Sequence, residues 1–141
     1  MKTILNITIA TMLLLGVVAV NTHAQTGAPK VIANIPFEFT VGKATLPAGR
    51  YTVTVMNPTS DRKILQIRQI DGRASAMVIT TDVTGNMSEN AKLVFHRYGD
   101  RHYFAQAQMA GDSTSLAAVK TRSEQKQALA TTKKIVMLTA A

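Results

Sequence analysis

Beyond residue 24, apolar and polar residues alternate with a period of two, and this alternation restricts the chain to strands that bury one face. In residues 35–41 the apolar side chains alternate with Pro36, Glu38 and Thr40, and residues 51–55 repeat the pattern with threonines between apolar residues. Proline has no amide donor, so Pro36 predicts that its strand either begins there or lies at a sheet edge.

Segments that contain glycine or proline divide this alternating sequence into strands. Turns are expected at Gly42-Lys43 and at residues 46–49, whose sequence is Leu-Pro-Ala-Gly, and a loop is expected at residues 57–61. Residues 81–91 carry a glycine, two asparagines and a serine, and we expect them to form a mobile loop.

The strongest hairpin signal lies in residues 63–80, where Asp71-Gly72 separates two alternating runs and predicts a two-residue type I′ turn. Pairing Ile70 with Arg73 sorts the side chains by polarity, and a slip of one residue would mix the two faces. The face predicted to be buried consists of Leu65, Ile67, Ala74, Ala76 and Val78.

A second hairpin is expected from residues 93–98 and 101–109 around Gly99-Asp100. A two-residue turn at this point pairs Arg97 with His102 and His96 with Tyr103. The hairpin therefore predicts which side chains of the two strands share a face.

The period changes after Gly111-Asp112. Thr121-Arg122-Ser123-Glu124 has the spacing of a capping box, in which the threonine hydroxyl and the glutamate carboxylate accept amides at the start of a helix. We expect two or three helical turns there, followed by a final buried strand at residues 133–139. The predicted fold is all-β: an antiparallel β-sandwich or small barrel of about seven strands with one short helix in the C-terminal region.

Residues 1–24 have the three parts of an export signal. Lys2 supplies the positive charge, residues 4–20 form an apolar run, and Thr22-His23-Ala24 ends in a small residue that a signal peptidase reads. We expect cleavage after Ala24, which leaves residues 25–141 as a single domain in the periplasm or outside a bacterial cell. An uncleaved membrane anchor is the alternative, although polar residues interrupt the apolar run.

The composition fits an exported domain that is held together by its core alone. Apolar residues make up 46% of the chain and charged residues 17%, which argues against disorder. No cysteine is present, which excludes disulfides, lipid attachment to cysteine, thiolate zinc sites and thiol catalysis.

The chain is basic, with a formal net charge of +8 that becomes +7 once Lys2 is removed with the signal. Such a charge would attract an anionic lipid, polysaccharide or nucleic acid. The basic residues are scattered, however, and no run of them exceeds two. We therefore expect a solvated surface and no nucleic acid partner, and we keep a polyanion-binding module as an alternative.

Three runs resemble a sequence pattern of a family of small exported proteins from soil bacteria. They are residues 34–42 (Asn-Ile-Pro-Phe-Glu-Phe-Thr-Val-Gly), 46–53 (Leu-Pro-Ala-Gly-Arg-Tyr-Thr-Val) and 93–100 (Leu-Val-Phe-His-Arg-Tyr-Gly-Asp), and they match IPFxFxVG, LPAGxYxV and LVFHRYGD. The family brings no activity, cofactor or catalytic residue to this chain. After Asp100 the sequence departs from the pattern, which leaves the hairpin register there open.

Polar chemistry concentrates at residues 96–102, where two histidines lie close to Asp100. Imidazole and carboxylate groups bind zinc, so His96, His102 and Asp100 are the candidate residues of a metal-dependent enzyme or an envelope hydrolase. The predicted register argues against a shared site because it sends the two imidazoles to opposite faces of the sheet. The sequence also has no G-x-S-x-G elbow and no phosphate-binding loop.

These observations favour a non-catalytic domain that acts by binding or structural association in the envelope or exterior of a bacterium. We assign no catalytic residue, cofactor or metal ligand. The partner is left open between an envelope polymer and another exported protein, and no membrane span is expected after signal cleavage. The enzyme that uses His96, His102 and Asp100 and the polyanion-binding module stay as alternatives.

Overall fold

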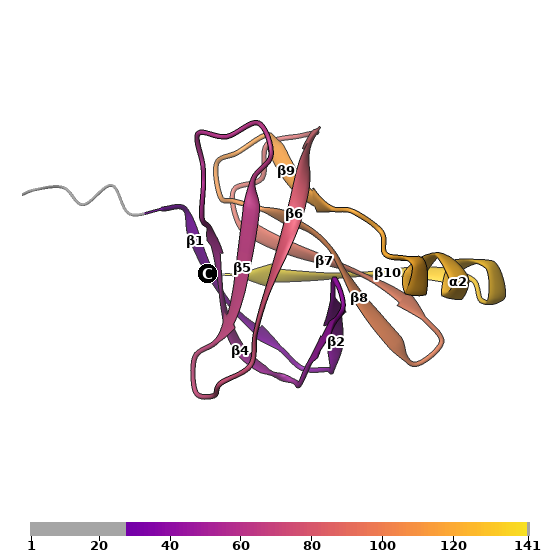
Figure 1. Ribbon diagram of the computed structural model, residues 1–141. Coiled ribbons are helices and arrows are strands. Elements are labelled where there is room, and N and C mark those ends of the chain that lie inside the picture. The colour runs from indigo at the N-terminus through magenta and orange to yellow at the C-terminus, as the bar shows by residue number, and fades with distance from the viewer. Residues whose placement is uncertain (1–27, 141) are drawn as a thin grey trace, which may run out of the picture.

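The computed structural model describes residues 28–140, which form ten strands and one helix (Figure 1). The expected export signal and its cleavage after Ala24 lie outside the described residues. Within residues 28–140, the helix is too short and too polar to cross a membrane. The elements are β1 (Lys30–Ile35), β2 (Phe39–Val41), β3 (Ala44–Leu46), β4 (Gly49–Val55), β5 (Ile64–Gln69), β6 (Ser75–Thr84), β7 (Ala91–Tyr98), β8 (Arg101–Gln108), β9 (Thr114–Ala118), α2 (Arg122–Ala130) and β10 (Lys133–Ala140).

The strands form one sheet with two halves that share the long strand β6 (Figure 1). The first part of β6 pairs with β5, which continues to β4 and β1, and the second part pairs with β9, which continues to β8. On its other side β8 pairs with β7, which pairs with β10. The chain is therefore all-β with one short helix, as predicted, and the sheet does not close into a barrel.

The β2–β3 hairpin joins the sheet through the single parallel contact in the described part of the chain, between Thr40 and Tyr103 of β8. Gly42 has a φ of +59° and begins the turn that the sequence predicts at Gly42-Lys43. The predicted turn at residues 46–49 also forms, because β3 ends at Leu46 and β4 begins at Gly49. These two turns place the β2–β3 hairpin beside β8, and the hairpin forms one wall of a hollow lined by Thr40, Lys43 and Thr45.

The core lies between the two halves of the sheet and contains edge-to-face contacts between aromatic rings. The Phe39 ring centroid lies 5.1 Å from that of Tyr51 in the first half and 5.4 Å from that of Phe95 in the second half. The Tyr51 hydroxyl donates to the Pro47 carbonyl at 2.6 Å, so this phenol is satisfied although its residue is fully buried. Phe39 thus connects the two halves through large, fully buried aromatic side chains.

The structure divides the predicted strand at residues 35–41 into two strands. β1 ends at Ile35, β2 begins at Phe39, and Pro36 lies in the break. Because Pro36 has no amide to donate to a ladder, the chain leaves one strand here and enters another part of the sheet. The short strand β9 was not predicted; Leu116 is its only buried residue, so it lacks a strong apolar alternation.

The hairpin in residues 63–80 has the predicted register but not the predicted turn. Ile67 lies opposite Ala76 and Arg68 opposite Ser75, and most of the predicted apolar face is buried. The type I′ turn at Asp71-Gly72 is wrong, because Gly72 does not have a positive φ. A wider connection forms instead, and the Gln69 amide donates to the Ala74 carbonyl at 2.8 Å.

Two predictions about exposure and pairing near the ends of strands are wrong. Residues 81–84 belong to β6 and pair with β9, so the predicted loop at residues 81–91 shrinks to residues 85–90. The strand at residues 133–139 forms as β10, but it is not buried: Ile135 is 63% exposed and Met137 57% exposed. β10 pairs with β7 alone, and its outward face is uncovered. The run of four apolar residues at 135–138 does not show that one of its faces is exposed.

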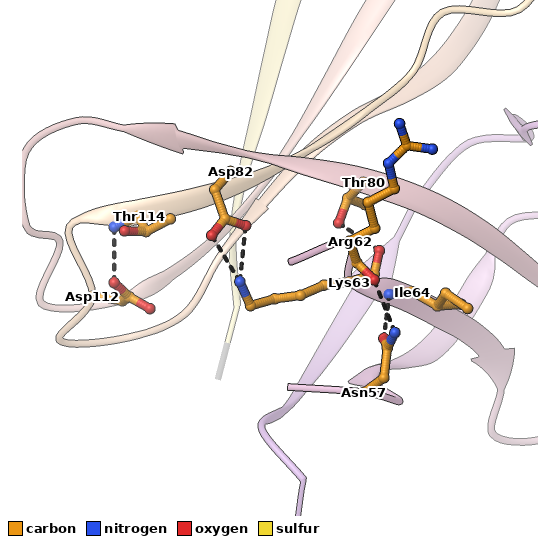
Figure 2. A network of polar contacts seen from close by, with 8 residues as sticks. All are labelled: Asn57, Arg62, Lys63, Ile64, Thr80, Asp82, Asp112 and Thr114. Atoms are coloured by element: carbon orange, nitrogen blue, oxygen red, sulfur yellow. Dashed lines mark hydrogen bonds and ion pairs between the residues drawn. The ribbon is translucent and has the colours of Figure 1, made fainter. Parts of the chain in front are cut away.

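Polar contacts fix the predicted loop at residues 57–61 to the start of β5, and they join Lys63, just before β5, to β6 (Figure 2). The Asn57 side chain accepts from the Ile64 amide at 2.6 Å, and the buried Thr80 hydroxyl donates to the Lys63 carbonyl at 2.9 Å. The Lys63 ammonium lies 2.7 Å from the carboxylate of Asp82. The positive charge of Lys63 is therefore already neutralised within the fold.

Replacing Gly99 with alanine tests the turn of the second hairpin. Gly99 has a φ of +61°, and an added Cβ would meet no atom within 4 Å, so only backbone strain opposes the change. We expect Gly99→Ala to lower the free energy of unfolding by about 1 to 2 kcal/mol. Gly85→Ala is the control, because Gly85 lacks a positive φ and its Cβ would make only an ordinary contact. Urea unfolding that gives equal effects for both variants would contradict the assignment.

Candidate functional site

The β7–β8 hairpin carries all three candidate residues and has the predicted register. Arg97 lies opposite His102, and His96 lies opposite Tyr103. Because successive side chains of a strand point to opposite faces, this pairing separates the two imidazoles across the sheet. The contacts of each ring, described below, confirm this separation.

The pairing beyond Asp100, which the sequence left open, follows the prediction only as far as Phe104. Phe104 lies opposite Phe95, but the next pair joins Val94 to Gln106. Ala105 is therefore an extra residue in β8, which is the arrangement of a β-bulge. The bulge lies beyond the histidines and does not change their faces.

His96 belongs to a buried polar cluster beneath α2, which we call the Glu124 cluster and which consists of His96, Tyr98 and Glu124. The Nδ1 atom of His96 lies 2.9 Å from Oε1 of Glu124, and the Tyr98 hydroxyl donates to the same oxygen at 3.2 Å. Glu124 is 5% exposed and Tyr98 is 2% exposed. An ionised carboxylate only accepts hydrogen bonds, so its contact with His96 requires the tautomer that carries a proton on Nδ1.

The environment of Tyr98 strongly favours its neutral phenol. Burial, followed by the negative charge and hydrogen bond of Glu124, raises the pKa of Tyr98 to about 12. A second phenol on this face, Tyr103, lies 3.2 Å from the hydroxyl of Ser123. Two tyrosines of the sheet thus contact consecutive residues at the start of α2.

The predicted capping box forms only in part, because Glu124 belongs to the Glu124 cluster and does not cap the helix with its carboxylate. The Thr121 hydroxyl accepts from the Glu124 amide at 3.2 Å, as predicted. The Glu124 carboxylate, expected to accept an amide at the helix start, contacts His96 and Tyr98 instead. Glu124 is also the only buried residue of α2, so a polar contact takes the place of an apolar helix face. No sequence pattern predicts this pairing, because His96 and Tyr98 are distant from Glu124 in the chain.

His102 lies on the opposite face and packs against aromatic side chains. Its ring is stacked on Phe37 with centroids 3.8 Å apart, and Phe37 in turn contacts Phe95 edge to face. The Nδ1 atom of His102 is buried and has no hydrogen-bond partner in the described part of the chain. Burial, and secondly the positive charge of Arg97, lower the pKa of His102, while Asp100 opposes this shift.

Asp100 is exposed in the turn and shares a hollow of about 260 Å³ with Glu38 and His102. Two of the three candidate residues therefore lie at one hollow, but His96 does not. Residues 28–140 contain no group of three or more histidine and acidic side chains that could hold a metal ion. Glu38, Asp100 and His102 line one hollow but do not converge into such a ligand group.

A larger hollow next to this one is lined by basic and hydroxyl side chains, and we call it the basic hollow. It has a volume of about 620 Å³ and lies between the β2–β3 hairpin, β8 and the start of α2. Its charged lining residues are Lys43, Arg101 and Arg122, and no acidic residue lines it. Because these three residues lie far apart in the sequence, their convergence could not be predicted from the scattered charges.

Comparison with known proteins found no matching protein-family model, no similar curated protein and no similar solved structure. The site must therefore be interpreted from its own chemistry. The structure holds His96 beneath α2, stacks His102 on Phe37 and leaves Asp100 in solvent.

Removing one hydroxyl at a time tests the importance of the Glu124 cluster. Tyr98→Phe removes a hydrogen bond to a buried charged group, so we expect the free energy of unfolding to fall by about 1.5 to 3 kcal/mol. Tyr103→Phe is the matched control on the same face; it removes a bond between neutral groups and should cost about 0.5 to 1.5 kcal/mol. Urea unfolding in which Tyr103→Phe costs as much as Tyr98→Phe would show that Glu124 has no special role.

Because the pKa of His102 is lowered, the stability of the protein should depend on pH. As the pH falls below about 6.5, the unfolded chain binds a proton at His102 before the folded chain does. The free energy of unfolding should therefore fall between pH 6.5 and the lower folded pKa, then level off. His102→Phe keeps an aromatic ring on Phe37 and cannot titrate, so it should lose less stability between pH 7.5 and pH 5 than the parent protein. Equal losses in chemical unfolding would contradict this assignment.

Proposed function

We propose that the protein is a non-catalytic β-domain, exported to a bacterial envelope or exterior, that acts by binding or structural association. One observation carries the proposal: His96 is hydrogen-bonded beneath α2, whereas His102 is stacked on Phe37 on the other face of the same hairpin. Acid-base or metal catalysis needs such groups to converge on one reacting atom. Export and membership of the small exported family are parts of this proposal that rest on residues 1–24 and on the three sequence runs.

The His96–Glu124 pair has the form of two members of a hydrolase triad, but its surroundings favour a structural role. A triad needs a nucleophile within hydrogen-bond reach of the second imidazole nitrogen. The hydroxyl of Ser123, which α2 contributes on this face, is bonded to Tyr103 instead. His96 lines neither the hollow of Asp100 and His102 nor the basic hollow. The pair therefore supports docking of α2 better than it supports catalysis.

One observation favours the alternative, an envelope hydrolase or metal-dependent enzyme. His102 and Asp100 line the same hollow, together with Glu38. A neutral imidazole beside carboxylates is a reasonable start for a metal site or a general base. Against this, the Nδ1 atom of His102 is buried without a partner, and the ring is held by stacking on Phe37 rather than by an orienting carboxylate.

Zinc binding separates the two functions. We expect the melting temperature of the protein to be the same with added zinc and with a chelator, and the same to hold for His96→Ala and His102→Ala. A true site supplied with zinc at a hundred times its dissociation constant would add about 2.7 kcal/mol to the free energy of unfolding. A zinc-dependent rise in melting temperature that His102→Ala abolishes would overturn the non-catalytic proposal in favour of the metal-dependent alternative.

A further inference from the structure

We propose that the basic hollow binds an acidic saccharide, meaning a sugar unit that carries a sulfate, phosphate or carboxylate group. The inference rests on the proposed function, because it names the class of partner with which the domain would associate. It depends on the charge of the hollow, on its hydroxyl groups and on its size.

The charge of the hollow is positive and uncompensated. Lys43, Arg101 and Arg122 line it, all three are exposed, and none forms an ion pair among residues 28–140. Lys63 shows the contrast, because its ammonium is bound to Asp82 within the fold (Figure 2). Three like charges around one concavity repel each other, and a bound anion relieves this repulsion.

The hydroxyl groups of the hollow suit a sugar. Thr40 and Thr45 lie opposite each other in the β2–β3 hairpin with their hydroxyls 3.5 Å apart, and Ser123 lines the facing wall at the start of α2. Hydroxyls both donate and accept hydrogen bonds, as the hydroxyls of a saccharide do. The side chains thus offer charge for the acidic group and hydrogen bonds for the ring that carries it.

The size and shape of the hollow favour a sugar unit over a membrane surface. A volume of about 620 Å³ lies within the range of small-molecule sites, about 300 to 1,000 Å³. An anionic bilayer presents a flat layer of headgroups, whereas these cations line a concavity. The carboxylate of Glu124, in the first turn of α2, is buried against His96 and does not line the hollow, so the three cations set its charge.

The neighbouring hollow sets the expected orientation of the ligand. It shares Thr40, Thr45 and Arg101 with the basic hollow and adds the carboxylates of Glu38 and Asp100. The acidic group of the ligand should therefore lie toward Lys43 and Arg122, away from these carboxylates. Glu38→Gln, which removes an exposed negative charge, should strengthen binding.

The test is isothermal titration of the exported protein at about 0.15 M salt with a heparin-derived sulfated hexasaccharide, with neutral maltohexaose and with phosphatidylglycerol vesicles. The hollow variant is Lys43→Gln/Arg101→Gln/Arg122→Gln. The control is Arg50→Gln/Arg62→Gln/Arg73→Gln, which removes the same charge from exposed residues that line none of the described hollows. Circular dichroism checks that both fold, and Arg122→Gln alone replaces the hollow variant if it does not.

We expect the sulfated hexasaccharide to bind, maltohexaose not to bind, and the hollow variant to lose about tenfold or more in affinity, which corresponds to about 1.4 kcal/mol. The control variant should stay within about threefold of the parent protein, because its charges are distant and screened. Equal losses in both variants, no binding of the hexasaccharide, or tighter binding to vesicles than to the hexasaccharide would overturn the site.

Failure of the proposed function gives a different result. Mass spectrometry of the hexasaccharide after incubation shows whether it is cleaved. Shorter fragments that the hollow variant no longer produces would overturn the non-catalytic function while supporting the acidic-saccharide site. An intact hexasaccharide that binds in the hollow supports both.

Discussion

The contact of Phe39 with both halves of the sheet is the interaction on which the other features depend. Its ring lies edge to face against Tyr51 on one side and Phe95 on the other. The sheet is open, so no closed ring of backbone hydrogen bonds holds the halves together. Burial of these rings supplies the cohesion instead, as expected for a chain without cysteine. The position of β2 beside β8, and with it the basic hollow, follows from where Phe39 is held.

The attachment of α2 depends on a different kind of force. Its only buried residue is Glu124, and Leu129 is 91% exposed, so apolar packing does little to hold the helix. A buried carboxylate is costly unless it is paired and hydrogen-bonded, and His96 and Tyr98 meet that condition. The hydrogen bonds of the Glu124 carboxylate therefore determine where the helix lies. Their directions specify its position more closely than apolar packing would.

The sequence predicts what depends on neighbouring residues and misses what depends on distant ones. The register of the first hairpin was predictable because alternation fixes it, that of the second was predictable as far as Phe104 because its turn has two residues, and the helix start was predictable from Thr121 and its spacing to Glu124. The turn at Gly72 and the exposure of β10 were not, because a wider connection and an uncovered face leave no local pattern. The Glu124 cluster and the basic hollow join segments brought together only by the fold.

The sharing of β6 between the two halves has a consequence for how the protein unfolds. Its first residues pair with β5 and its last residues pair with β9, so neither half has an edge of its own at this strand. Melting either half would strip hydrogen bonds from a strand that the other half still needs. The two halves therefore lose their structure together, and the domain behaves as one cooperative unit although its sheet is open.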